Sequence, residues 1–290
     1  MSKRENPVIL RILFTASLGG LLALGSTGCQ QALRNRGLHP DYSGPTYEVA
    51  DKKALIVTTS HAVLNEPGET DGDPTGVFAS EMTIPYYDFL DADMEVHVAS
   101  VKGGEIPIDP KSFRPALRAP EDERYLEDPI FRAKTYNSIP VAEVDFKDYD
   151  VVFFSGGWGA AYDMSQSEVI AEKVSEAYYE SNVIYGSVCH GALAFTSAKD
   201  KNGEPLVKGR TMTGVTQGQL DQLNIAFTPK HPEEELVKSG ADYQCSRGRR
   251  DFFETLTVVD EEERFVTGQN QNSSHETAHQ IMRILATKIP

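Results

Sequence analysis

Cys189 stands where a nucleophile could be presented, at a turn between two segments of different composition. The run 182–186 is short and apolar and predicts a buried strand, and the run 191–195 predicts the start of a helix. Unpaired amide N–H groups at that helix end would face the sulfur and favour the thiolate, and the neighbouring His190 can do the same. A strand-to-helix turn of this kind exposes the nucleophile of many hydrolases. The residues predict a reactive cysteine, although a free cysteine can also be an inert, buried apolar side chain.

Gly156 and Gly157 follow a second apolar run, 151–154, at the end of a strand. A glycine has no Cβ atom, so its backbone amide can closely approach a negatively charged oxygen. We expect the amides of Gly157 and His190 to form an oxyanion hole. The alternative is a glycine pair that only makes a turn, and the two interpretations are compatible.

Four short apolar runs predict the parallel strands that would hold these residues. They are rich in β-branched and aromatic residues and comprise 54–59, 95–99, 151–154 and 183–185. Strands that alternate with helices indicate a doubly wound α/β sheet.

Helical apolar spacing covers residues 80–90 and 165–181 between these strands. In the second of these segments, Ser165 is the expected N-cap and Glu168 its capping-box partner. Both helices would cover the faces of the sheet.

The remainder of the chain is expected to complete this sheet. Residues 210–215 predict a further strand, and 254–260 with 264–267 predict a hairpin around the acidic turn 261–263. Residues 104–146 are rich in proline and charge and lack clear periodicity. We interpret them as an inserted cover segment rather than a second domain.

The N-terminal residues indicate export. Lys3 and Arg4 precede an apolar run over 12–24, which is too short to span a bilayer comfortably. This combination predicts a signal peptide over residues 1–28. The alternatives are an uncleaved anchor and an ordinary secretory signal.

Gly28-Cys29 resembles a bacterial lipobox, with Ser26 where such boxes usually carry leucine. We expect lipid on Cys29, a tether over 29–50 and a folded domain over 51–290. The protein would then be attached to a membrane through this lipid, at the cell envelope.

Charge and cysteine content restrict the partners. The chain has 290 residues and a formal net charge of −15, which argues against a nucleic-acid partner. With lipid on Cys29, the other thiols are Cys189 and Cys245. A disulfide between them is the less favoured alternative, because it would consume the nucleophile.

Two histidines, His275 and His279, have the i,i+4 spacing of metal ligands on one helix face. The spacing of the other histidines and acidic residues identifies no third ligand. We expect neither a metal nor a cofactor.

Five segments, in order, resemble the PfpI superfamily, a cysteine hydrolase-like group similar in fold to class I glutamine amidotransferases. The segments are 75–86, 98–110, 155–163, the turn at Cys189, and 266–274. Together they are typical of the branch that holds heat-shock chaperone and glyoxalase III proteins. The resemblance implies a flavodoxin-like α/β/α sandwich and a homodimer.

The resemblance also implies further site residues. Glu81 matches the family glutamate beside the cysteine, and it would be protonated there because two neighbouring negative charges are costly. Asp221 is the nearest carboxylate to the position of a third catalytic residue that orients His190. Trp158 stands where this branch usually carries histidine, which alters the substrate pocket.

The implied reaction is that of a cofactor-independent glyoxalase, which converts a small 2-oxoaldehyde such as methylglyoxal into a 2-hydroxy acid. Cys189 would add to the aldehyde, and Glu81 or His190 would transfer protons. Two alternatives remain from the same residues: a hydrolase of peptide or amide bonds, and a non-enzymatic redox sensor or chaperone that uses Cys189 as an oxidisable switch.

Overall fold

A seven-stranded sheet forms the centre of the protein in a computed structural model that describes residues 42–223, 227–247 and 254–287. The strand order is β10-β11-β7-β6-β1-β4-β5, and every neighbouring pair is parallel except β10 and β11. The bounds are β1 Lys53–Thr58, β4 Glu95–Ser100, β5 Ile139–Pro140, β6 Val151–Phe154, β7 Ile184–Val188, β10 Thr257–Val259 and β11 Phe265–Gly268. The predicted doubly wound sheet and the predicted hairpin are confirmed.

The central strands are apolar along their whole length because both faces of the sheet are covered. In β1, Leu55 and Val57 face one hydrophobic cluster, while Ala54 and Ile56 face a second cluster on the opposite side. This alternation follows from the two-residue period of a strand. It places a helical layer on each face.

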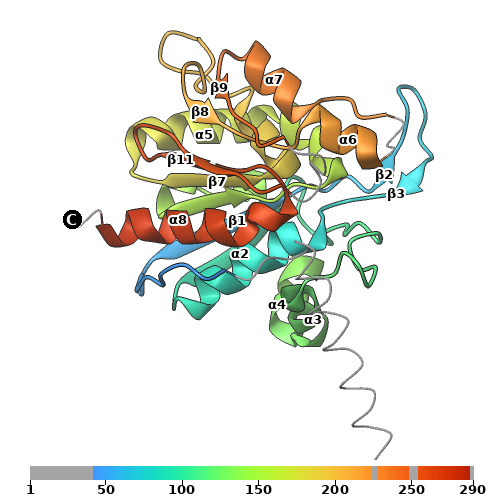
Figure 1. Ribbon diagram of the computed structural model, residues 1–290, viewed down its shortest axis with the longest axis horizontal. Helices are drawn as coiled ribbons and strands as arrows, with labels where there is room; N and C mark the ends of the chain where they lie inside the picture. Colours follow the sequence, from blue (N-terminus) through green and yellow to red (C-terminus); the bar gives the residue numbers. More distant parts are fainter. Residues whose placement is uncertain (1–41, 224–226, 248–253, 288–290) are drawn as a thin grey trace, which may run out of the picture. The chain divides into compact units, whose positions relative to one another are not determined.

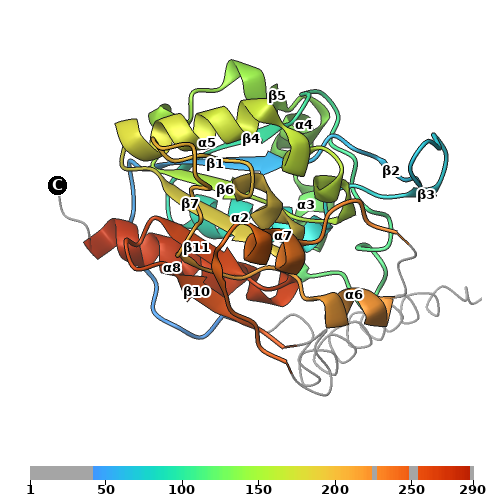
Figure 2. The same ribbon diagram turned by 90° about the horizontal axis from the view of Figure 1, so that it is seen from above.

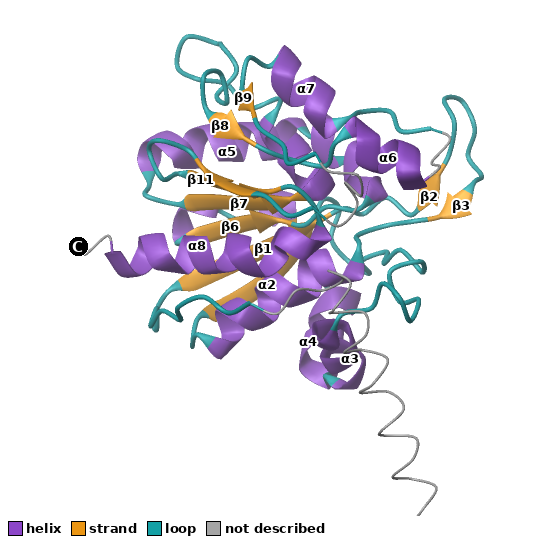
Figure 3. Cartoon of the chain, in the orientation of Figure 1, coloured by secondary structure: helices purple, strands orange, loops and turns teal. Residues whose placement is uncertain are grey.

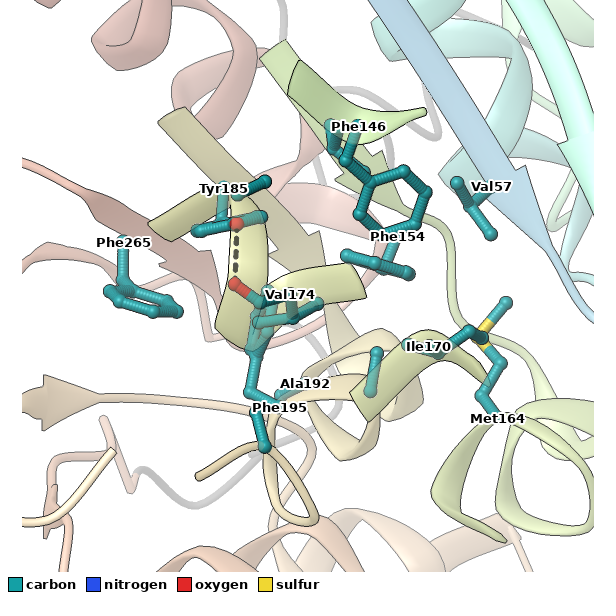
Figure 4. Close-up of a cluster of buried hydrophobic side chains, with 14 of the residues drawn as sticks. Val57, Phe146, Phe154, Met164, Ile170, Val174, Tyr185, Ala192, Phe195 and Phe265 are labelled. Atoms are coloured by element: carbon teal, nitrogen blue, oxygen red, sulfur yellow. Dashed lines mark hydrogen bonds between the residues drawn. The ribbon is translucent and has the colours of Figure 1, made fainter. Parts of the chain in front are cut away.

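Helices α2 (Ala79–Asp91) and α8 (Ser274–Thr287) pack side by side on one face, and α5 (Glu168–Glu180) covers the other (Figures 1 and 2). The cluster under α5 is shown in Figure 4, where Tyr185 of β7 donates a hydrogen bond of 2.8 Å to the carbonyl of Val174. That bond satisfies a buried hydroxyl in an otherwise apolar cluster.

Shorter elements connect these layers (Figure 3). The helices are α3 Pro120–Glu127, α4 Pro129–Tyr136, α6 Gln217–Leu223 and α7 Pro232–Lys238, and the strands are β2 Val63–Leu64, β3 Asp73–Pro74, β8 Thr211–Met212 and β9 Asp242–Tyr243. The 3₁₀ helices are η1 Val141–Glu143, η2 Phe146–Asp148, η3 Trp158–Ala161, η4 Met164–Gln166, η5 Cys189–Phe195 and η7 Gln271–Ser273.

Three local predictions need correction. Residues 210–215 do not extend the main sheet, because only β8 forms there and it pairs with β9 in a separate two-stranded sheet. The N-cap of α5 is Ser167, whose side chain accepts the amide N–H of Ile170, and Ser165 belongs to η4. The helix expected after Cys189 is the 3₁₀ helix η5.

Residues 42–50, expected to be part of a tether, pack on the domain instead. Val49 is buried in the cluster beneath α2 and α8, and the ring of Tyr42 stacks on His279 of α8. The cover segment 104–146 contains α3, α4 and β5, and β5 joins the edge of the main sheet.

Candidate active site

Cys189 lies between the end of β7 and the start of η5, in a strained backbone conformation. Its φ angle is +57°, in the left-handed region that a residue with a side chain seldom adopts. Such strain persists where the surrounding structure enforces it, and it is frequent at active sites. The turn leaves the side chain 8% exposed. The position is the one expected for a nucleophile.

His190 contacts the sulfur through its Nδ1 atom, 3.4 Å from Sγ of Cys189. Burial, together with the nearby His231, lowers the pKa of His190 to about 3. The imidazole is therefore neutral at physiological pH and helps the thiolate by hydrogen bonding, not by positive charge. The indole of Trp158 packs against it, with ring centroids 4.7 Å apart.

Glu81 reaches the same point from the first turn of α2. The residue is 1% exposed, and this burial raises the pKa of its carboxyl group to about 8, despite hydrogen bonds with Cys189 and the Gly156 amide that favour the ionised form. Glu81 accordingly retains its proton at neutral pH, because a second negative charge beside the thiol would be costly. A protonated Glu81 can donate a hydrogen bond to the sulfur.

The electrostatic balance at Cys189 depends on that proton. Burial raises the pKa of the thiol, and negative charge on Glu81 raises it further. The backbone N–H groups of His190 and Gly157 lower it, because they donate hydrogen bonds to the sulfur. These are the two amides expected to form the oxyanion hole, so an oxygen bound next to Sγ would find the same donors.

Gly156 is a glycine for steric reasons. A Cβ atom at this position would lie 2.4 Å from Oε2 of Glu81 and 2.7 Å from the amide nitrogen of His190. Gly157 adopts φ +99°, where a side chain would also be strained. The pair brings the backbone of the β6 end into direct contact with both groups beside the thiol.

The thiol opens into a cavity of about 310 Å³. The carboxyl end of the sheet contributes its floor, and the cover segment contributes Asp109, Lys111, Arg114 and Leu117. The remaining wall consists of Phe78, Glu81, Gly157, Trp158, Cys189, His190, Val215, Gln219, Asn270 and Gln271. The predicted cover thus forms one side of the pocket, and the pocket combines an apolar wall with a few polar groups.

Asp221 does not reach this site. It is exposed on α6, where its Oδ1 atom accepts a hydrogen bond of 2.8 Å from the Gln217 side chain. The preceding residue, Leu220, is buried, and successive helical side chains point in different directions, so Asp221 faces outward. Among the described residues, the Nε2 atom of His190 has no hydrogen-bond partner. The expected third catalytic residue is not provided by Asp221.

Reasoning from the sequence gave no role to His231 at this site. It caps α7, where its Nδ1 atom accepts the N–H of Glu233 at 3.1 Å, and it contributes to the low pKa of His190. Gln219 and the cationic pair Lys111 and Arg114 are likewise pocket residues that no spacing in the sequence revealed. Only the fold brings these segments to residue 189.

The alternative disulfide does not form. Both Cys189 and Cys245 are free, and Sγ of Cys245 accepts a hydrogen bond of 3.0 Å from Nε of Arg247. The nucleophile therefore remains available.

The fold and this site define a class of cysteine-dependent α/β proteins, and sequence comparison identifies the family. The DJ-1/PfpI family profile matches residues 75–283. The chain belongs to the DJ-1/PfpI family.

Similar proteins are known from both sequence and structure. Glyoxalase 3 of Candida albicans is 31% identical over 238 residues, which cover 79% of this chain and 97% of that protein. A glutathione-independent glyoxalase of Saccharomyces cerevisiae is also 31% identical and covers 79% and 96%. The crystal structure of glyoxalase III from Candida albicans superposes with a TM-score of 0.68 at 28% identity, covering 82% and 98%. The Rapid Encystment Protein of Francisella tularensis gives a TM-score of 0.73 at 31% identity, covering 81% and 99%.

The predictions of a signal peptide, a lipoprotein and an envelope location are overturned by these comparisons. The relatives match over 97% and 96% of their own length and are named as glyoxalases. No helix among the described residues is long and apolar enough to cross a membrane. The lipobox prediction rested on Gly28-Cys29 without the usual leucine, and both residues lie outside the described part of the chain.

Proposed function

We propose that this protein is a cofactor-independent glyoxalase that converts a small 2-oxoaldehyde into a 2-hydroxy acid through Cys189. The observation that carries the proposal is the contact between the Cys189 thiol and a buried, protonated Glu81 beneath two backbone amides. The relatives named as glyoxalases match this chain over most of its length, which supports the same reaction.

The first step is addition of the Cys189 thiolate to the aldehyde carbon. The bond between sulfur and C1 forms, and the electron pair of the carbonyl moves to its oxygen. The amides of Gly157 and His190 stabilise that negative charge, and Glu81 donates its proton to give a hemithioacetal. Glu81 is then a carboxylate next to an uncharged sulfur.

Glu81 is the better proton carrier for the second step. A group transfers protons best when its pKa lies near the working pH, and the pKa of Glu81 is about 8 whereas that of His190 is about 3. Glu81 takes the proton from C1, which produces an enediolate with its negative charge on the C2 oxygen, and then returns that proton to C2. The C1 hydroxyl loses its proton to the C2 oxygen, and a thioester of the 2-hydroxy acid remains on Cys189.

Water completes the cycle. It adds to the thioester carbonyl, and the bond between C1 and sulfur breaks with the electron pair going to sulfur. The hydroxy acid leaves as its anion, one proton restores Glu81 and one enters solvent. The net reaction consumes one aldehyde and one water, and no redox partner or cofactor is needed.

The size of the cavity favours a small substrate over a polypeptide. A volume of about 310 Å³ lies at the lower end of the range for small-molecule sites, and the cover residues Lys111, Arg114 and Leu117 line it. A cysteine peptidase that uses histidine as the general acid for the departing amine needs that histidine protonated, whereas the pKa of His190 is about 3.

The test is turnover of methylglyoxal by the purified chain in the absence of glutathione and added metal. We expect 2-hydroxy acid to accumulate and a Cys189→Ser variant to form none. A panel of peptide and amide substrates is assayed in parallel. Amide cleavage, or a folded protein that alkylates at Cys189 but produces no hydroxy acid, would overturn the proposal.

Assembly as a homodimer remains a prediction from the family resemblance. Sedimentation of the purified chain measures it directly.

A further inference from the structure

Three potential metal ligands meet between α2 and α8, apart from the residues that line the cavity. His275 and His279 lie one helical turn apart in α8, in the segment His275-Glu276-Thr277-Ala278-His279. Two histidines at this spacing present their imidazoles on one helix face, a common arrangement in zinc sites. The sequence alone offered no third ligand, and the fold supplies Asp88 from α2.

The three ligand atoms are close enough to surround one ion. Nδ1 of His275 lies 2.9 Å from Oδ2 of Asp88, and Nε2 of His279 lies 4.0 Å from the same oxygen. One ligand atom from each residue falls within 4.8 Å of the other two. Ligands about 2.0–2.1 Å from a tetrahedral zinc ion stand roughly 3.3 Å apart. Small rotations of the three side chains would therefore bring their ligand atoms to the separations that zinc requires.

We propose that Asp88, His275 and His279 bind a divalent transition-metal ion of the zinc type. Two imidazole nitrogens and one carboxylate oxygen suit zinc and its neighbours in the first transition series, whereas calcium and magnesium require mainly oxygen ligands. The fourth position would be taken by water, because the side chains of these three residues are 11–20% exposed.

Neighbouring groups match the surroundings of a metal site. The Nε2 atom of His275, on the side of the ring away from Asp88, lies 3.8 Å from Oε1 of Glu121. A carboxylate at the far nitrogen orients a ligating imidazole and increases its basicity. The ring of Tyr42 stacks on His279 at 3.6 Å and restrains its rotation.

The site would join two helices that frame the catalytic cavity. Asp88 follows Glu81 by seven residues on α2, about 10 Å along the helix axis. α8 directly follows η7, which carries Gln271 of the cavity wall. Glu276, in the position of the general base in zinc proteases, bonds instead to Gln280 at 2.7 Å. We therefore assign metal binding that holds α2 against α8, and no hydrolytic reaction.

The experiment measures Zn²⁺ binding to the full chain by equilibrium dialysis, with Co²⁺ absorption as a second readout. The Cys189→Ser background removes the catalytic thiol, because cysteine thiolates can themselves bind zinc. We expect one equivalent of Zn²⁺ in this background, and a Co²⁺ spectrum without a thiolate charge-transfer band. His275→Ala, His279→Ala and Asp88→Asn should each weaken binding by at least about tenfold.

His97→Ala is the matched control, because His97 also contacts a carboxylate, Glu95 at 2.9 Å, but lies on β4. It should bind Zn²⁺ as the parent does. Asp88→Asn keeps the shape of the side chain, so it tests ligation even if an alanine variant unfolds. Unchanged Zn²⁺ affinity in Asp88→Asn and His275→Ala, or loss of the bound equivalent in Cys189→Ser alone, would overturn the proposal.

Discussion

The Nδ1 atom of His190 lies 3.4 Å from Sγ of Cys189, and the imidazole that makes this contact is neutral. A histidine next to a reactive cysteine often supplies positive charge to the thiolate. Here burial prevents that charge, so the thiolate depends on the amides of His190 and Gly157 and on the proton of Glu81. The Glu81 carboxyl thus controls both the nucleophile and the proton transfers.

Replacing Cys189 by serine should reduce turnover of methylglyoxal by at least about 10³-fold, because the alkoxide of serine is not formed without a strong base. Initial rates of hydroxy-acid formation measure the loss. Cys245→Ser is the matched control and should keep the parent rate, since Cys245 is not among the residues that line the cavity. Parental turnover in a folded Cys189→Ser protein would contradict the nucleophile assignment.

Replacing Glu81 by glutamine should reduce turnover by about 10²- to 10⁴-fold, because the amide retains shape but cannot exchange a proton with the substrate. Iodoacetamide should still alkylate Cys189 readily, since the neutral amide adds no charge beside the thiolate. The two rates are measured on the same preparation. A fully active Glu81→Gln enzyme would exclude the acid–base role.

Asp122→Asn is the control for that variant. Asp122 is also a buried carboxyl group, bonded to Thr83 of α2 at 2.7 Å, but it is not part of the cavity wall. We expect it to change kcat less than threefold, an effect on the order of 0.6 kcal/mol.

The pH profile of kcat/KM should fall above about pH 8, where Glu81 loses its proton. The resulting negative charge raises the pKa of the Cys189 thiol and removes the hydrogen bond to sulfur. This descending limb is measured in the parent and in Glu81→Gln. The fall in kcat/KM should disappear in the variant. If kcat/KM falls at the same pH in both proteins, a group other than Glu81 is responsible.

Asp122 should make the protein less stable as the pH rises. Burial raises the pKa of its carboxyl group from 3.8 to about 7, although hydrogen bonds from Thr83 and the Ala119 amide favour the ionised form. The folded state therefore binds a proton that the unfolded state releases, and this contribution is present below about pH 4 and is lost as the pH rises toward 7.

Within that window the free energy of unfolding should fall by up to about 1.4 kcal/mol per pH unit for this group. Asp122→Asn should remove this part of the slope, as measured by urea denaturation at several pH values. Glu81→Gln provides a second comparison, because its carboxyl group also has a raised pKa. Identical slopes in the parent and Asp122→Asn would refute the prediction.

Gly156→Ala should abolish most turnover by displacing the groups beside the thiol. The new Cβ would lie 2.4 Å from Glu81 Oε2 and 2.7 Å from the His190 nitrogen, so the β6 end or the nucleophile turn must shift. We expect a loss of at least about 10²-fold with slower alkylation of Cys189. Gly203→Ala is the control, because its new Cβ meets nothing within 4 Å, and it should keep the parental turnover.

The local pattern of the sequence was enough to predict the central strands and the turn that carries Cys189. Continuous apolar runs such as 151–154 indicate strands covered on both faces, and glycines around Cys189 indicate a tight turn. These signals are readable because they arise from neighbours in the chain. Glu81 required the family resemblance, since an isolated glutamate in a helix carries no local mark of burial.

The tertiary structure alone decided which distant residues share a site and whether His190 is charged. Desolvation depends on everything packed around a group, so the neutral His190 does not follow from spacing. For the same reason, Asp221 was a plausible partner by position but faces outward on α6. Asp88 joins His275 and His279 only because α2 and α8 pack together. Asp88 and His275 are 187 residues apart in the chain. Contacts between distant segments are set by the packing of helices on the sheet, which no local pattern encodes.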